Sequence, residues 1–349
     1  MDFTLTEAQQ ELASLTRRIL TDRATPERLR EVEASDDRFD RSLWKELAAA
    51  GVLDAVELGL LDQCSVALEI GRAVAPVPYL ASIVMGASTL SRFGTTDQQA
   101  RWAAQATLGD LVLTAALNAE ETPRVEPTGD GWLLNATFTA VPAGPYADLI
   151  LVPVGERVFL VEPGDEGVKV ERQQLVDGDS AARLELVNVA LAGDRVLTGS
   201  DIGQWIRDRA TVGLCAQQLG ITERALEMTA SYATSRVQFG RAIGTFQAVA
   251  QRLADAYIDV EAIRLTMWQA AWRLCEGLPC ETEISTAKFW AADGGHRVAH
   301  TAVHVHGGVG IDVDYPLHRY FVAAKQNEFA LGHATEHLLR IGAVLASEQ

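Results

Sequence analysis

The 349-residue sequence has few cysteines, few basic residues and no long hydrophobic run. No apolar stretch approaches the ~20 residues that a membrane-spanning helix needs. The first residues, Met1-Asp2-Phe3-Thr4, have neither the basic nor the apolar segment of a secretion signal, so we expect a cytoplasmic protein. An excess of 47 acidic over 30 basic residues gives a formal net charge of -17. This charge disfavours nucleic acid and anionic membrane surfaces as partners.

The four cysteines match no zinc-binding spacing. Cys215 lies in an apolar stretch and is expected to be a small core residue. Cys275 and Cys280 flank a turn, and a disulfide between them is not expected in a reducing compartment. His300 and His304 are spaced i, i+4 on an expected helix, which is a common arrangement for two metal ligands. Because the sequence places no third ligand nearby, we expect no metal site.

Secondary-structure signals divide the chain into three segments. Residues 1–112 have helical patterns, which begin with the capping-box candidate Thr6-Glu7-Ala8-Gln9. Residues 113–195 contain short β-rich runs separated by turn residues. Residues 202–349 return to helical periodicity and include one long apolar seam. The seam consists of Val249, Leu253, Ala256, Val260, Ile263, Met267, Ala270 and Leu274. We therefore expect a mostly α fold with a small antiparallel β domain in the middle and a helical bundle at the C-terminal end.

The stretch Arg236–Gln247 is the most informative candidate for ligand binding. It places two arginines, two amide side chains and two aromatic rings around glycines at the junction of two expected helices. A planar guanidinium suits a diphosphate because it can donate two parallel charge-assisted hydrogen bonds. Glycines let a ligand come close to the backbone. From the residues alone, an ordinary glycine-containing turn with solvated arginines explains the pattern equally well.

A second glycine-rich stretch is His304–Gly310. Its glycines do not follow a strand and open a helix, as a Rossmann fingerprint would require. We expect them to end a helix and to permit the close approach of a large group.

Together these stretches resemble the acyl-CoA dehydrogenase family. Arg236–Gln247 matches the family's R-x-x-F-G…Q signature. Ala287-Lys288, His304–Gly310 and Tyr315-Pro316 match its later segment, which is usually Q-x-x-G-G-x-G followed by Y-P. The resemblance is strong over the C-terminal part of the chain and weak in the middle.

The resemblance implies an FAD-dependent oxidoreductase that dehydrogenates an acyl-CoA thioester between Cα and Cβ. Family members have an N-terminal helical domain, a β domain and a C-terminal four-helix bundle. FAD lies across a subunit interface, with its ring on the β domain of one subunit and its diphosphate and adenosine on the bundle of the neighbour. By position, the residues implied to hold the diphosphate-adenosine half are Arg236, Gln238, Phe239, Gln247, His304, Gly307 and Gly308. His304 stands where the family usually has Gln.

The family's catalytic carboxylate has no counterpart in this sequence. Most members carry it as the Glu of an E-G-T segment, and here Gly332 occupies that position in the run Leu331–Thr335. Other members carry it on the first bundle helix, where a gap-free count places Ala210. Asp208, two residues away, and Glu336 are alternative bases, although a solvated helical carboxylate is the more ordinary role for both. Losing a positioned base typically reduces the rate ~100- to 10,000-fold.

The segments expected on the ring and acyl sides also depart from the family. The stretch Leu113–Asn118 and the following Ala119–Pro123 lack the glycines that would approach a flavin ring. Phe138–Val141 corresponds to a flavin-packing strand but has no tryptophan. In the N-terminal part, Val52–Glu57 continues without a glycine-rich acyl-site loop.

We therefore predict a non-catalytic subunit that forms an α2β2 heterotetramer with a related catalytic acyl-CoA dehydrogenase subunit. It would complete the partner's FAD site, and the partner would bind most of the acyl-CoA. The resemblance associates such shortened members with the degradation of bulky acyl-CoA side chains such as those of steroids. Two alternatives stay open. One is a self-sufficient homomeric dehydrogenase with an unusual base such as Asp208, and the other is a flavin-free structural or regulatory assembly module.

Overall fold

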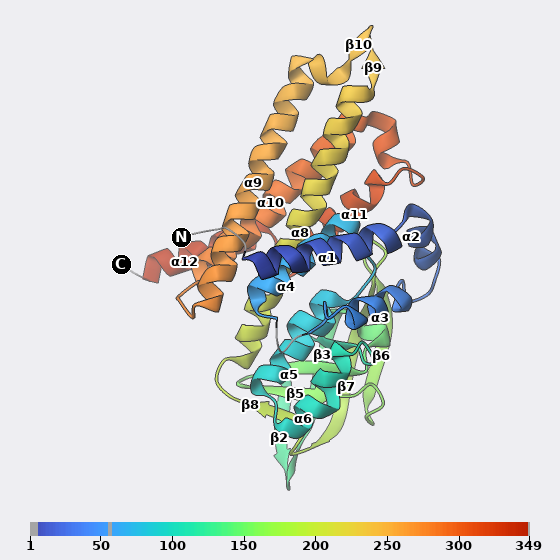
Figure 1. The fold of residues 1–349 in the computed structure, drawn as a ribbon. Helices are drawn as coiled ribbons and strands as arrows, with labels where there is room; N and C mark the ends of the chain where they lie inside the picture. Colours follow the sequence, from blue (N-terminus) through green and yellow to red (C-terminus); the bar gives the residue numbers. More distant parts are fainter. Residues whose placement is uncertain (1–5, 55–57, 348–349) are drawn as a thin grey trace. The chain divides into compact units, whose positions relative to one another are not determined.

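The computed structural model describes residues 6–54 and 58–347, and Figure 1 shows the fold coloured along the sequence. The chain divides into two compact units. The first consists of Met1–Arg28, Leu60–Ala75 and Thr211–Gln349, and the second consists of Leu29–Gly59 and Pro76–Ala210.

The order of elements along the chain is helices, then strands, then helices. The described helices are α1 (Glu7–Arg23), α2 (Pro26–Glu33), α3 (Arg41–Ala49), α4 (Leu60–Ala73), η1 (Leu80–Ala87), α5 (Ser88–Phe93), α6 (Thr96–Gln98), η2 (Gln99–Ala103), α7 (Ala104–Thr107), η3 (Gly144–Tyr146), α8 (Ile202–Ser235), η4 (Ile243–Thr245), α9 (Gln247–Cys275), α10 (Glu281–His306), η5 (Gly307–Ile311), α11 (Leu317–Phe329) and α12 (Ala334–Ser347). The described strands are β1 (Leu113–Ala115), β2 (Arg124–Thr128), β3 (Gly131–Pro142), β4 (Leu149–Val154), β5 (Arg157–Val161), β6 (Val168–Gln174), β7 (Ser180–Ala192), β8 (Val196–Thr198), β9 (Val237–Gln238) and β10 (Arg241–Ala242). The expected fold class is confirmed.

Side-chain caps begin two of the N-terminal helices, and the first is the capping box that the sequence predicts. Thr6 caps α1, because its hydroxyl accepts from the Gln9 backbone N–H while the Gln9 side chain accepts from the Thr6 backbone N–H. Asp40 caps α3 by accepting from the backbone N–H groups of Ser42 and Leu43. Both arrangements satisfy N–H groups that a helix leaves without an internal partner.

The first unit is built on the apolar seam of α9. Ala256, Val260, Ile263 and Met267 are buried, and α9 packs against α10 and α4. Helix α10 also packs against α11 and α12, and α1 packs against α4. Cys215 of α8 is buried as expected, and burial raises the pKa of its thiol to about 12. None of the helices that the structure describes is long and apolar enough to cross a membrane.

The second unit holds the β domain. In the described residues it forms two four-stranded sheets, with strand orders β1-β4-β5-β8 and β2-β3-β7-β6. Their pairs are antiparallel except β1–β4, which is parallel because the chain between them builds β2 and β3 of the other sheet. Phe138, Phe159 and Leu184 belong to the buried apolar cluster of this domain. The β-rich runs expected between 113 and 195 are therefore confirmed.

Candidate functional site

The stretch Arg236–Gln247 forms a short hairpin between the long helices α8 and α9 (Figure 1). Its strands β9 and β10 pair with Gln238 opposite Arg241. The two loop residues, Phe239 and Gly240, have φ angles of +53° and +79°. Two positive φ angles in a two-residue hairpin loop are typical of a type I′ turn, which favours Asn and Gly. The expected junction of two helices is thus present, and it carries an aromatic residue where a small one would be less strained.

Phe239 is held in solvent by this turn. Its side chain is 93% exposed, and the nearby Val237 is also exposed. The left-handed conformation costs an ordinary L-residue about 1–2 kcal/mol. A strained backbone that presents an apolar ring to water is typical of a contact surface rather than of a stable isolated turn.

The hairpin also carries polar side chains before and after Phe239 in the sequence. Arg236 is exposed, while its backbone N–H donates to the Tyr232 carbonyl and its carbonyl accepts from Ile243, both at 2.8 Å. The guanidinium of Arg241 lies 4.2 Å from the centroid of the Phe246 ring, a cation–π distance. The exposed side chains predicted to contact a cofactor in this segment are Arg236, Gln238, Phe239 and Gln247. They give a chain of strongly negative net charge a local basic and amide-rich surface.

The second predicted segment lies at the end of α10, as the glycine pattern indicates. Helix α10 ends at His306, and Gly307 has a φ of +64° at its C-cap. His304, Gly307 and Gly308 are exposed. A Cβ added to Gly307 or Gly308 would meet no atom within 4 Å, whereas one on Gly310 would lie 3.0 Å from backbone atoms of Val303. The open space therefore lies beside the two glycines that the sequence assigns to the cofactor.

The structure links these two segments through His306, a residue for which the sequence indicates no role in a cofactor site. The buried His306 ring stacks on Tyr232 of α8, with ring centroids 4.3 Å apart. Tyr232 lies one turn before Arg236, and His306 precedes Gly307. The pattern of sequence letters offers no signal for this contact, because it joins helices that are far apart along the chain.

The His300 ring packs against other aromatic side chains. It lies against His296 and packs edge-on against Phe321. Among residues 6–54 and 58–347, no group of three or more His, Cys, Asp and Glu side chains could hold a metal ion.

The turn at Gly332 connects α11 to α12. Gly332 has a φ of +101°, and its carbonyl accepts a 2.7 Å hydrogen bond from the ammonium of Lys288. The same ammonium donates to the Glu328 carbonyl at 3.1 Å. Lys288 is fully buried, and burial lowers its pKa to about 8. The lysine thus fixes the backbone at the position that the resemblance assigns to the family's catalytic Glu.

The side chains next to Gly332 leave little room for a carboxylate. A Cβ on Gly332 would lie 2.9 Å from His337 Nε2 and 3.0 Å from Glu336 Oε2. Glu336 pairs with Arg340 one turn along α12. His337 is buried, burial lowers its pKa to about 4, and its Nε2 lies 3.1 Å from the Leu331 carbonyl. The Glu336 side chain is thus partly exposed but paired with a guanidinium, whereas the His337 ring is buried and hydrogen-bonded to the turn itself.

The other predicted base position lies near the start of α8. Ala210 is buried and has no ionisable group. The amide of Gln204 donates to Asp208 Oδ1 at 2.7 Å. Arg207 donates to the carbonyl of Leu117 at 2.7 Å, which ties α8 to the segment after β1.

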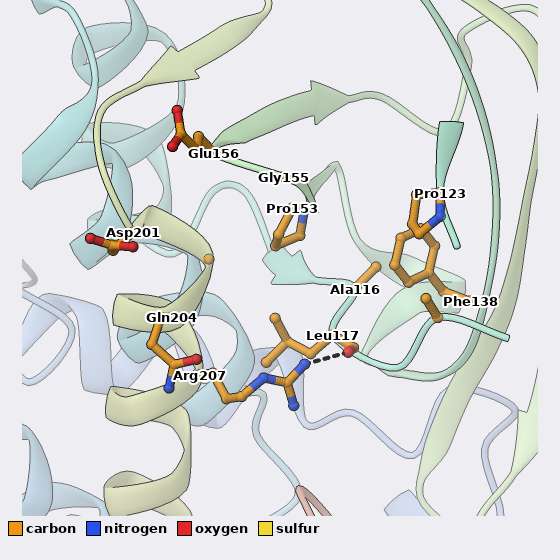
Figure 2. A pocket seen from close by; sticks show the side chains of 12 residues that line it. Ala116, Leu117, Pro123, Phe138, Pro153, Gly155, Glu156, Asp201, Gln204 and Arg207 are labelled. Carbon is orange, nitrogen blue, oxygen red and sulfur yellow. Dashed lines mark hydrogen bonds between the residues drawn. The ribbon is translucent and has the colours of Figure 1, made fainter. Parts of the chain in front are cut away.

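A pocket of about 380 Å³ lies beside this Arg207 contact (Figure 2). Pro123 and Phe138 form one side, and the carboxylates of Glu156 and Asp201 lie on the other side of the view. Of the described residues, its lining comprises Ala116, Leu117, Ala119, Pro123, Phe138, Pro153, Gly155, Glu156, Asp201, Gly203, Gln204 and Arg207. Asp208 is not among them. The volume is at the lower end of the range for small-molecule pockets.

The segments that the resemblance assigns to the flavin ring are held by internal hydrogen bonds. The buried Thr114 donates from its hydroxyl to the Pro142 carbonyl at 2.6 Å. The backbone N–H of Ala140 donates to the Gln173 side chain at 2.8 Å. In the N-terminal run Val52–Glu57, Val52 and Leu53 are buried, and residues 55–57 lie outside the described residues.

Comparison with known proteins gives consistent matches. The family model described as "Acyl-CoA dehydrogenase, N-terminal domain" matches residues 6–110, and "Acyl-CoA dehydrogenase, C-terminal domain" matches residues 204–346. The chain is 47% identical to "Acyl-CoA dehydrogenase FadE27" of Mycobacterium tuberculosis over 99% of each chain. It is similar to a chain of the ChsE4-ChsE5 complex from Mycobacterium tuberculosis, with a TM-score of 0.96 and 47% identity over 99% of each chain.

A chain of the "Tcur3481-Tcur3483 steroid ACAD G363A variant" gives a TM-score of 0.93 at 39% identity, again over 99% of each chain. The matches cover both helical regions, and the closely similar structures extend over the β domain as well. This chain belongs to the acyl-CoA dehydrogenase family of FAD-dependent oxidoreductases.

Proposed function

We propose that the chain is the non-catalytic subunit of a heteromeric acyl-CoA dehydrogenase. It completes the FAD site of a related catalytic subunit by holding the diphosphate-adenosine half of the cofactor. The complex is an α2β2 heterotetramer in which the partner supplies the catalytic Glu, the ring site and most of the acyl-CoA contacts. The chain alone is inactive.

The main support for the proposal is a difference between two turns of the first unit. The hairpin at Phe239 uses a strained backbone to present an aromatic ring and Arg236 to solvent. The turn at Gly332, where a base is required, has a glycine fixed by the buried Lys288. Groups suited to a dinucleotide are retained, whereas the proton acceptor is not.

The residues present fit the nucleotide half of FAD. Arg236 can donate two charge-assisted hydrogen bonds to a diphosphate, and the amides of Gln238 and Gln247 add further donors. The space beside Gly307 and Gly308 lets phosphate oxygens approach the backbone. The ring of Phe239 covers an apolar part of the ligand and excludes water there. Bound FAD would supply the acceptor for the β-hydrogen of the thioester as hydride, and the proton acceptor for the α-carbon would come from the partner subunit.

The relatives support a hetero-oligomer and a substrate class. The similar ChsE4-ChsE5 structure is named as a complex, and the Tcur3481-Tcur3483 structure is named as a steroid acyl-CoA dehydrogenase. We infer that this chain also pairs with a related subunit and acts on bulky acyl-CoA thioesters such as steroid side chains.

Flavin measurement with and without the partner tests the proposal. We expect the chain purified alone to be colourless and unable to reduce an acceptor dye with an acyl-CoA. Co-expression with the catalytic subunit should give a yellow complex that is active. A yellow, active chain without a partner would show a homomeric dehydrogenase with a base such as Asp208. A complex whose flavin content does not depend on this chain would show an assembly module.

The Phe239→Asn variant should change stability and FAD binding in opposite directions. Asn tolerates a positive φ, so we expect the free energy of unfolding of the chain alone to rise by about 0.5–1 kcal/mol. The same change should weaken FAD binding by the complex, because the apolar ring is lost. Chemical denaturation and FAD titration measure the two effects.

Val237→Thr is the matched control, because it changes an exposed apolar side chain of the hairpin without touching the loop. Its effect on stability should stay within about 0.5 kcal/mol. If Phe239→Asn left FAD affinity unchanged, Phe239 would not be a cofactor contact.

A further inference from the structure

We propose that His306 is a positioning residue. It fixes the Arg236 hairpin and the Gly307 turn relative to each other, so that both can contact the same dinucleotide cofactor. The inference rests on the proposed function and adds to it a residue that does not touch the ligand. His306 is 4% exposed and lies between the two exposed segments rather than among them.

Three contacts fix the orientation of the His306 ring. Its Nδ1 lies 2.8 Å from the carbonyl of Ala302, which can only accept, so Nδ1 carries the proton. Its Nε2 is then an acceptor, and the hydroxyl of Tyr315 lies 3.3 Å away as the donor. One face of the ring stacks on Tyr232, with an interplanar angle of 23°. The neutral imidazole therefore has a partner at each nitrogen and an aromatic ring against one face.

These contacts join three separate segments of the chain. Tyr232 belongs to the last turn of α8, and its carbonyl accepts from the backbone N–H of Arg236. His306 is the residue before Gly307, which turns the chain away from α10. Tyr315 precedes Pro316, and α11 begins one residue later. A movement of the imidazole would thus shift the hairpin and the glycine turn relative to each other.

A histidine does more here than an apolar residue of similar size. A phenylalanine could fill the space and stack on Tyr232, but it could not bond to Ala302 and Tyr315. Burial lowers the pKa of His306, so the imidazole is neutral at neutral pH. Among the described residues, Tyr232 of α8 and Tyr315 of the segment before α11 are the titratable side chains with ring or hydrogen-bond contacts to His306. Burial and Tyr232 raise the pKa of Tyr315, so its hydroxyl keeps its proton.

The pH dependence follows from this arrangement. Protonation of Nε2 in acid removes the acceptor for the Tyr315 hydroxyl and places a positive charge in the stack. Because the folded-state pKa is lowered, this loss occurs below the usual range for histidine. FAD affinity of the complex should therefore be constant near neutral pH and fall in acid.

The test measures FAD affinity and thermal stability of the complex with the catalytic subunit. His306→Phe keeps the ring and removes both hydrogen bonds, and Tyr315→Phe removes only the donor hydroxyl. We expect each to weaken FAD binding about 3- to 10-fold. His300→Phe, on the same helix but outside the stack, should leave FAD affinity unchanged. In acid, FAD affinity should also fall less for the His306→Phe complex than for the wild-type complex, because the variant has no imidazole to protonate.

A double-mutant cycle separates positioning from general destabilisation. If His306 positions the hairpin, Arg236→Ala should weaken FAD binding less in the His306→Phe background than in the wild type. Strictly additive effects, or a lower melting temperature with unchanged FAD affinity, would overturn the inference. If His306→Phe prevents assembly, Tyr315→Phe decides the question by the same readouts. An Arg236→Ala complex with unchanged FAD affinity would instead overturn the proposed function itself.

Discussion

Arg236→Ala should weaken FAD binding by the complex of this chain and its catalytic partner about 10- to 100-fold, because hydrogen bonds to charged groups contribute about 1.5–3 kcal/mol. Arg236 is exposed at the start of the hairpin, and its backbone is fixed on both sides by the Tyr232 and Ile243 hydrogen bonds. Removing the side chain therefore leaves the fold of the hairpin intact. Titration of the deflavinated complex with FAD measures the loss directly.

The charge-matched control is Arg18→Ala on the exposed face of α1. It makes the same change in net charge but lies outside the hairpin, so it should leave FAD affinity within experimental error. Raising the salt concentration should weaken FAD binding more in the wild-type complex than in the Arg236→Ala complex, because the variant has lost a charge–phosphate interaction. Equal effects of the Arg236 and Arg18 variants would mean that Arg236 acts only through long-range charge.

The sequence predicts the scaffold of this site well because its signals are local. The capping box at Thr6 is fixed by residues within one turn, and the α9 seam follows from helical periodicity alone. The glycines after Arg236 indicate the junction between α8 and α9, although the two-stranded hairpin at this junction is seen only in the structure. The cofactor residues are predicted by the resemblance, from their positions, and not by local signals.

The contacts that position the site could not be predicted in the same way. His306, Tyr232 and Tyr315 come together because three elements pack, and no periodicity relates their positions. Lysines are rarely buried in proteins, yet Lys288 is buried and bound to the carbonyls of Glu328 and Gly332. Buried polar contacts between distant segments depend on the packed fold, so they become visible only in the structure.

Gly332→Glu should fail to create an active dehydrogenase, although it introduces the residue type that the resemblance assigns to this position in most of the family. A non-glycine residue in a sparsely populated backbone region costs about 1–3 kcal/mol, and displacing the His337–Leu331 hydrogen bond adds about 1 kcal/mol. We therefore expect the free energy of unfolding to fall by about 2–4 kcal/mol. Thermal or chemical denaturation measures this loss, and a dye-reduction assay with an acyl-CoA should stay at background.

Gly277→Glu is the control that isolates the cause. Gly277 also has a positive φ, +64°, but a Cβ there would meet no atom within 4 Å. The Gly277→Glu variant should show the free-energy cost of a positive φ without the crowding by His337 and Glu336. Its loss of unfolding free energy should therefore be smaller than that of Gly332→Glu. If Gly332→Glu instead gave a stable, yellow chain that turned over an acyl-CoA without a partner, the missing base would be the only defect. The segments assigned to the ring and acyl sides would then have to be functional, and the division of labour between two subunits would be wrong.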